Sequence, residues 1–179
     1  MIAPESALLV VIDIQGNLFQ AMQDKENLLV NAVKMIKGAR TFDLPLLATE
    51  QMPEKLGPTV LPVLQEFDGV EPIGKESFSS WQNNHFRERL AAMSRRDTII
   101  IGIECHVCVY QTAIDLIENG YRVHVVSDAV SSRTAENCRT GLAAMKSAGA
   151  KLTSTEMVLF ELLRTAEDVR FKEIHKIVK

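Results

Sequence analysis

Residues 98–116 read Thr-Ile-Ile-Ile-Gly-Ile-Glu-Cys-His-Val-Cys-Val-Tyr-Gln-Thr-Ala-Ile-Asp-Leu. The β-branched run Thr98–Ile101 predicts a buried strand, and the stretch His106–Asn119 predicts a helix. Gly120 follows at the position where a glycine commonly ends a helix. A strand that passes through a short loop into a helix is the repeating unit of α/β proteins.

The same alternation of apolar runs and amphipathic stretches continues in both directions. Further strands are predicted at Ala7–Ile12, Leu44–Ala48, Glu71–Ile73, Arg122–Val126 and Lys151–Thr155, and helices at Lys25–Phe42, Asn83–Met93, Thr134–Ala148, Glu156–Leu163 and Ala166–Ile177. Strands rich in Val, Ile and Leu that alternate with helices indicate a parallel sheet covered on both faces. We therefore predict one domain over residues 1–179, an α/β/α three-layer sandwich with a mostly parallel, Rossmann-like sheet of about six strands.

The composition excludes several classes of protein. The chain has 179 residues, of which 46% are hydrophobic and 24% charged, and this balance is typical of globular proteins rather than disordered or fibrous ones. The longest apolar run, Ala7–Ile12, is far too short for a membrane helix. A net charge of −3 argues against nucleic-acid and membrane partners, and three cysteines, an odd number, indicate a reducing, cytoplasmic setting.

Reactive side chains follow three of the predicted strands. In open parallel sheets ligands bind at the carboxyl ends of the strands, where Asp13, Lys75 and Cys108 are expected. Cys108 lies in the first turn of a predicted helix, a place that favours a thiolate. Asp13 would accept the thiol proton, and Lys75 would keep Asp13 ionised and stabilise developing negative charge.

Each of these residues also has a purely structural interpretation. Cys108 would be a small apolar filler, Asp13 a cap for a helix over residues 15–20, and Lys75 a solvated surface charge. The functional interpretation is favoured because all three residues fall at one edge of one sheet.

Cys105 and Cys108 form a C-x-x-C motif, which is also found in thioredoxin-like redox enzymes. Those enzymes place a cis proline beside the dithiol, but all six prolines of this chain precede Cys105. There is no second cysteine pair, and His85, His124 and His175 show no metal-ligand spacing. No metal and no cofactor are therefore expected.

Three segments resemble the isochorismatase-like cysteine hydrolases. Ile100–Leu116 is similar to the family's signature, in which C-V-x-x-T-A-x-D-A follows a strand, a glycine and a short loop. Val11–Gln15 resembles its V-x-D-x-Q motif, and Gly74–Ser79 resembles its K-x-x-x-S segment. The resemblance extends from Ala7 to about Ser154, with the motifs in the family's order.

This resemblance implies a catalytic triad of Asp13, Lys75 and Cys108, with Cys108 rather than Cys105 as the nucleophile. It also implies a cis peptide bond at Ile103–Glu104 and an oxyanion hole formed by the backbone N–H groups of Glu104 and Cys108. The chain departs from the metal-binding nicotinamidases of the family, because it has no histidine before His85.

The function expected from these observations is hydrolysis of an amide or related C–N bond in a small molecule, through a thioester on Cys108. Ether hydrolysis of the isochorismatase type, a C-x-x-C oxidoreductase and a catalytically idle binding or scaffold protein remain as alternatives. Candidate pocket residues, each of which could instead pack in the core, are Phe19, Gln51, Phe78, Trp81 and Tyr110.

Two further expectations concern the surface. Family members generally assemble, and Met52, Leu56, Val60 and Leu61 are expected to form an apolar patch, so we predict a homo-oligomer. Cys108 is expected to be alkylated quickly at pH 7, and Cys138, which lies within a predicted helix, slowly.

Overall fold

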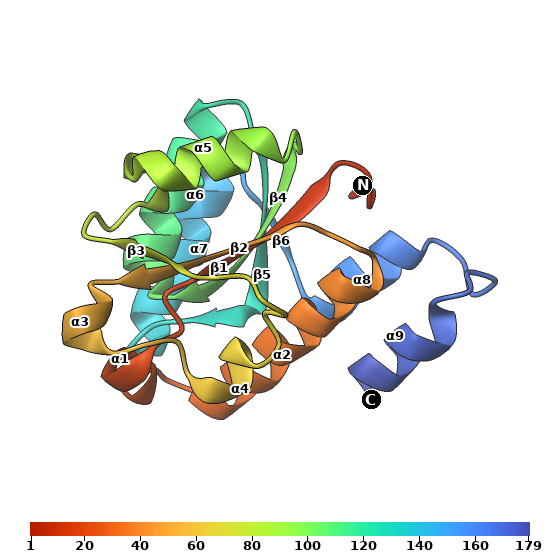
Figure 1. Ribbon diagram of the computed structural model, residues 1–179, viewed down its shortest axis with the longest axis horizontal. Coiled ribbons are helices and arrows are strands. Elements are labelled where there is room, and N and C mark those ends of the chain that lie inside the picture. Colours follow the sequence, from red (N-terminus) through yellow and green to blue (C-terminus); the bar gives the residue numbers. More distant parts are fainter.

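Six parallel strands form one sheet in the order β3-β2-β1-β4-β5-β6 (Figure 1). The computed structural model describes all residues from 1 to 179. The strands are β1 (Ala7–Ile12), β2 (Leu46–Gln51), β3 (Ile73–Lys75), β4 (Asp97–Ile103), β5 (Arg122–Ser131) and β6 (Lys151–Thr153). The predicted α/β sandwich with a parallel, Rossmann-like sheet is confirmed, and the chain reverses its direction of travel across the sheet between β1 and β4.

Helices cover both faces of the sheet (Figure 1). They are α1 (Gly16–Gln20), α2 (Lys25–Thr41), α3 (Pro53–Leu56), α4 (Leu61–Leu64), α5 (Asn84–Ala92), α6 (Tyr110–Glu118), α7 (Ala135–Ser147), α8 (Thr155–Leu163) and α9 (Phe171–Val178), with a 3₁₀ turn η1 (Ser80–Gln82) and a π-helical turn η2 (Cys105–Val109). Helices α2, α8 and α9 bury side chains against one face, and α5, α6 and α7 against the other.

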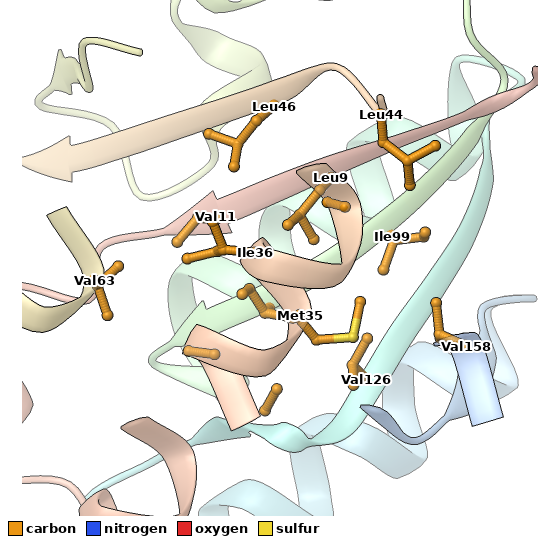
Figure 2. Close-up of a cluster of buried hydrophobic side chains, with 14 of the residues drawn as sticks. Leu9, Val11, Met35, Ile36, Leu44, Leu46, Val63, Ile99, Val126 and Val158 are labelled. Atoms are coloured by element: carbon orange, nitrogen blue, oxygen red, sulfur yellow. The ribbon is translucent and has the colours of Figure 1, made fainter. Parts of the chain in front are cut away.

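Strand β1 shows why the sheet is buried on both sides. All six of its residues are buried, with Leu9 and Val11 on the face of α2 and Leu8 and Val10 on the opposite face. Figure 2 shows side chains of α2, Met35 among them, pointing toward residues of the central strands. Successive side chains of a strand point to opposite faces, so a continuous apolar run is what a sheet between two helix layers requires.

A glycine allows β1 and β4 to approach each other next to the candidate site. Gly102 pairs with Ile12 and has a φ of 128°, a conformation that side chains other than glycine rarely adopt. A Cβ atom at this position would lie 2.1 Å from the Ile12 carbonyl oxygen. The glycine therefore lets the carboxyl ends of these two strands lie side by side.

Several predicted boundaries are corrected by the sheet pairing. Strand β2 runs on to Gln51 and β3 to Lys75, because Gln51 and Lys75 pair with each other. Strand β5 continues to Ser131 rather than ending at Val126. Its pairing with β4 shifts between Ile100 and Gly102, so the polar residues after Val126 occupy an irregular part of the strand.

The segment from residue 49 to 74, expected to be irregular, contains the short helices α3 and α4. Of the predicted apolar patch, Met52, Leu56 and Val60 are half-buried, and Val60 packs against the core, which leaves Leu61 as the exposed member. Nowhere in the structure is a helix both long enough and apolar enough to cross a lipid bilayer.

Candidate active site

The carboxyl ends of β1, β3 and β4 bring the three predicted catalytic residues to one edge of the sheet. Asp13 follows β1 in a left-handed backbone conformation with a φ of 52°, and Lys75 is the last residue of β3. Cys108 lies in the turn η2, which leads from β4 into α6.

Asp13 and Lys75 form a buried ion pair. Lys75 Nζ lies 2.7 Å from Asp13 Oδ2, and the hydroxyl of Thr49 donates to Asp13 Oδ1 at 2.7 Å. Both carboxylate oxygens therefore have a partner. Helix α1 begins after Gln15 and receives no side-chain cap, so the capping interpretation of Asp13 is wrong.

The ammonium group of Lys75 is surrounded by acceptors. Besides Asp13, it donates to Gln51 Oε1 at 2.7 Å and to the carbonyls of Phe78 and Ser77 at 3.1 and 3.2 Å. Gln51 in turn donates to the Glu76 carbonyl at 2.7 Å. Lys75 is therefore not a solvated charge, and Gln51, predicted as a pocket wall, is instead a partner of the lysine.

Cys108 sits in a turn of unusual hydrogen bonding. The backbone N–H groups of Val107 and Val109 both donate to the Glu104 carbonyl, at 3.0 and 3.2 Å. Single π-helical turns of this kind are frequent at functional sites. The peptide bond between Ile103 and Glu104, just before the turn, is cis.

The environment of Cys108 disfavours ionisation of its thiol. Burial raises the pKa of the Cys108 thiol to about 12, and the charge and hydrogen bonding of Asp13 act in the same direction. Lys75 and a backbone hydrogen bond from Glu104 lower the pKa only in part. Burial thus opposes the thiolate that the start of a helix favours, and Asp13 is the neighbouring group that would accept the proton.

Cys105 points away from this arrangement. Its side chain is fully buried, and its sulfur lies 3.6 Å from the backbone carbonyl of Cys138 on α7. All three cysteines are free thiols. The structure therefore directs Cys105 toward α7 and Cys108 toward Asp13, so the two thiols of the C-x-x-C motif have different surroundings.

The predicted pocket residues lie in different surroundings. Phe19 belongs to the core cluster beneath α2, so the packing interpretation applies to it. Trp81 makes an edge-to-face contact with Tyr121, with ring centroids 5.9 Å apart. Phe78 is 54% exposed and Tyr110 is half-buried, so these two remain candidates for contact with a substrate.

Among the cavities of the molecule, three are lined by none of the predicted pocket residues. One of about 900 Å³ lies between α2, the segment from residue 66 to 70 and α9, and one of about 800 Å³ runs from Lys75 to His85 beside β3. The third, of about 230 Å³, lies between β5 and α7. No three His, Cys, Asp or Glu side chains come together in a way that would hold a metal ion.

Two pairs of residues near the site were not predicted. Arg133 Nε lies 2.9 Å from Glu104 Oε2, and His106 Nδ1 lies 2.9 Å from the hydroxyl of Ser132. Both pairs join the loop after β5 to the turn that carries Cys108. They were missed because the sequence placed the end of β5 at Val126, five residues too early.

The isochorismatase domain model matches residues 7–157. The chain belongs to the isochorismatase family. Among its relatives, isochorismatase domain-containing protein 2A from Mus musculus is 38% identical and aligns over 99% of this chain and 85% of its own length.

Solved structures agree with this assignment. A structure described as MAR1 ribonuclease from Caenorhabditis elegans superimposes with a TM-score of 0.94 at 32% identity, over 99% of this chain and 91% of the other. The YcaC gene product from Escherichia coli, described as an octameric hydrolase of unknown specificity, has a TM-score of 0.88 at 26% identity, over 92% and 83% of the two chains. The chain thus has the fold of the isochorismatase-family hydrolases.

Proposed function

We propose that this isochorismatase-family protein is a cysteine hydrolase that cleaves an amide or related C–N bond of a small molecule. The observation that carries the proposal is the placement of the Cys108 thiol beside Asp13, which is itself held by Lys75 at 2.7 Å. A nucleophile, a base and a group that orients the base are the elements of nucleophilic catalysis.

In the first half of the reaction, Asp13 takes the proton of the Cys108 thiol as the sulfur attacks the carbonyl carbon of the substrate. The C–S bond forms, and the carbonyl electron pair moves onto oxygen. The backbone N–H groups of Glu104 and Cys108 would stabilise this oxyanion. When the intermediate collapses, the C–N bond breaks and the amine leaves with the proton that Asp13 holds.

In the second half, water attacks the thioester. Asp13 accepts a proton from the water, the C–S bond breaks, and the proton returns to the departing sulfur. The ammonium group of Lys75 donates to Asp13, Gln51 and two backbone carbonyls. Its role is to hold the carboxylate in place and to balance the negative charge that develops on the sulfur.

The surroundings of Cys105 favour the hydrolase over the oxidoreductase. A C-x-x-C redox enzyme needs its second thiol to resolve a mixed disulfide on the first. Here the sulfur of Cys105 is directed toward the Cys138 carbonyl and is fully buried. Cys108, by contrast, has a carboxylate base beside it, which hydrolysis requires and dithiol exchange does not.

The experiment is turnover of a panel of primary amides, substituted amides and N-carbamoyl compounds, with rapid-quench mass spectrometry to detect an acyl group on Cys108. We expect Cys108→Ala, Asp13→Asn and Lys75→Ala each to abolish turnover, since general acid–base catalysis alone contributes about 10²–10⁴ in rate. Circular dichroism verifies that each variant is folded. Cys105→Ser is the matched control and should keep most of the activity.

Three results would overturn the proposal. Insulin reduction that needs both Cys105 and Cys108 would favour the oxidoreductase. Cleavage of a vinyl ether or of RNA that survives Cys108→Ala would indicate chemistry without a thioester. Absence of any turnover, together with no acyl group on Cys108 across the panel, would favour the idle binding or scaffold protein.

Self-association is part of the proposal. The octameric relative supports it, and so do the exposed side chains of Leu61 and Leu64 on α4, which are 63% and 37% exposed. We expect light scattering at micromolar concentration to give the mass of a dimer or a larger assembly. A monomeric mass would contradict this.

A further inference from the structure

Cys105, which the proposed hydrolase mechanism does not use, lies next to Cys138 of α7. Cys105 Sγ lies 3.6 Å from the backbone oxygen of Cys138. Cys105 comes from the turn that carries Cys108, whereas Cys138 is 33 residues further along the chain. The pair thus joins a helix to the nucleophile turn.

Helix α7 packs closely against this turn. A Cβ atom on Gly141 would lie 2.9 Å from the Cys105 carbonyl oxygen and 2.9 Å from His106 Cα. Cys138 and Gly141 are three residues apart, so they lie on one face of α7. The glycine brings the helix backbone against the turn, where Cys105 Sγ reaches the backbone of Cys138.

Cys138 is also reachable from outside. It is only half-buried, and it lines the cavity of about 230 Å³ between β5 and α7 together with Leu28, Val130 and Leu142. A cavity of this volume is large enough for a molecule the size of hydrogen peroxide. Cys105 has no exposed surface and does not line this cavity.

We propose that Cys138 is a thiol oxidation site for peroxides and that Cys105 is its resolving thiol, so that oxidation yields a Cys105–Cys138 disulfide. Accessibility assigns these roles, because Cys138 lines the cavity and Cys105 has no exposed surface. The neighbouring Cys105 side chain lowers the pKa of Cys138, and the neighbouring Cys138 side chain together with burial raises the pKa of Cys105. The more acidic and more accessible thiol is the one that reacts first.

The chemistry balances with peroxide as the oxidant. The Cys138 thiolate attacks one peroxide oxygen, the O–O bond breaks, and hydroxide leaves, which gives a sulfenic acid. The sulfur of Cys105 then attacks the sulfur of Cys138. The S–S bond forms, the S–O bond breaks, and the departing hydroxide takes the Cys105 proton to become water. Two thiols and one hydrogen peroxide thus give one disulfide and two water molecules.

This disulfide is not the one that the C-x-x-C motif suggests. Cys108 is separated from the cavity by its place beside Asp13 and is not among the residues that line it. The bond would connect α7 covalently to the turn between β4 and α6. The inference stands apart from the proposed hydrolase activity, because it needs neither a substrate nor the catalytic residues.

The test treats the folded protein with an equimolar amount of hydrogen peroxide, blocks remaining thiols with N-ethylmaleimide, and digests with trypsin without reduction. We expect a crosslink between the peptide 97–122, which carries Cys105 and Cys108, and the peptide 134–139, which carries Cys138. The thiol count in denaturant should fall from the three free cysteines to one. Dithiothreitol should restore all of them.

Variants decide which cysteines take part. Cys105→Ser and Cys138→Ser should each remove the crosslink, and Cys108→Ser should keep it. Cys105→Ala and Cys138→Ala are second choices if a buried serine hydroxyl prevents folding. Loss of the crosslink in Cys108→Ser, accumulation of Cys138 sulfinic acid without any crosslink in the wild type, or a bond only between two molecules would each overturn the proposal.

Discussion

Nζ of Lys75 lies 2.7 Å from Oδ2 of Asp13, and neither side chain exposes any surface to solvent. Two buried charges in this geometry behave as one unit. Replacing both with uncharged groups is often tolerated, but removing one leaves the other buried without compensation. The candidate site therefore depends on a pair whose members stabilise the fold only together.

We expect Lys75→Met to lower the free energy of unfolding by about 3–5 kcal/mol, because the Asp13 carboxylate loses its buried cation. Asp13→Asn should also destabilise the protein, since it leaves the ammonium group uncompensated. The double variant should be more stable than the sum of the two losses predicts. Urea denaturation followed by circular dichroism gives the three values and the coupling between them.

Lys172→Met is the control for this cycle, because Lys172 is exposed on α9 and a surface substitution changes stability by less than about 0.5 kcal/mol. Purely additive losses in the double variant would mean that the two charges do not depend on each other.

The periodicity of the sequence was sufficient to predict the buried strands and the edge of the sheet where the candidate catalytic residues lie. Apolar runs such as Ala7–Ile12 must be buried on both faces, and the residues that follow strands must gather at one edge of a parallel sheet. These two rules placed Asp13, Lys75 and Cys108 together before any contact was known.

The rest depended on pairing and burial, which a single sequence does not specify. Thr49 and Gln51 lie two residues apart on β2 and so point to the same face, where both reach the ion pair. That spacing was a usable signal, but the strand was predicted to end at Ala48. For Cys108, the position at the start of a helix suggests a lowered thiol pKa, whereas burial has the larger effect on that pKa and raises it.

The rates of alkylation should differ between Cys108 and Cys138, because the two thiols have different surroundings. With iodoacetamide at pH 7 we expect Cys138 to be labelled first and Cys108 slowly, because Cys138 is more exposed and its pKa is lowered, whereas the pKa of Cys108 is about 12. This reverses the order predicted from the sequence. Labelling of Cys108 should rise steadily between pH 7 and pH 9.5 without a plateau.

Mass spectrometry of the labelled peptides measures both rates, and Cys138→Ser shows the reaction of Cys108 alone. Rapid labelling of Cys108 that is already constant at pH 7 would mean that its thiolate forms in the resting protein.

The opposite end of the sheet should govern stability in acid. His124 is buried with its Nε2 atom 3.0 Å from Asp97 Oδ1, and burial lowers the pKa of His124 below its ordinary value of 6.5. A histidine whose pKa is lowered by folding stabilises the protein above pH 6.5, and this contribution is lost as the pH falls. We expect the free energy of unfolding to decrease as the pH is lowered from about 6.5 to 5.

His124→Gln should flatten this pH dependence, because glutamine keeps a polar group near Asp97 but does not titrate. His85→Gln, at an exposed position, should leave the wild-type slope unchanged. Burial also acts on Asp97, but hydrogen bonds from Arg122, Ser6 and His124 outweigh it and lower its pKa. A second loss of stability below about pH 4 should therefore remain in both variants.

The hydroxyl of Thr49 provides the sharpest test of how Asp13 is held. It donates to Asp13 Oδ1 at 2.7 Å, and Thr49 is only 2% exposed, so no water takes its place easily. Thr49→Val keeps the shape of the side chain and removes the donor, which leaves a buried carboxylate oxygen without a partner. We expect a loss of about 1–3 kcal/mol in stability. Turnover should fall at least tenfold in kcat with little change in KM, because Thr49 acts through Asp13 rather than on the substrate.

Two further variants separate the loss of the hydrogen bond from the effect of replacing a buried threonine. Thr49→Ser keeps the donor and should retain most of the turnover. Thr98 is fully buried on β4, but its hydroxyl has no hydrogen-bond partner in the protein. Thr98→Val removes an unpaired polar group from the core, so it should leave stability unchanged or raise it. Equal losses in Thr49→Val and Thr98→Val would trace the effect to changing a buried threonine and would remove Thr49 from the group of residues that position Asp13.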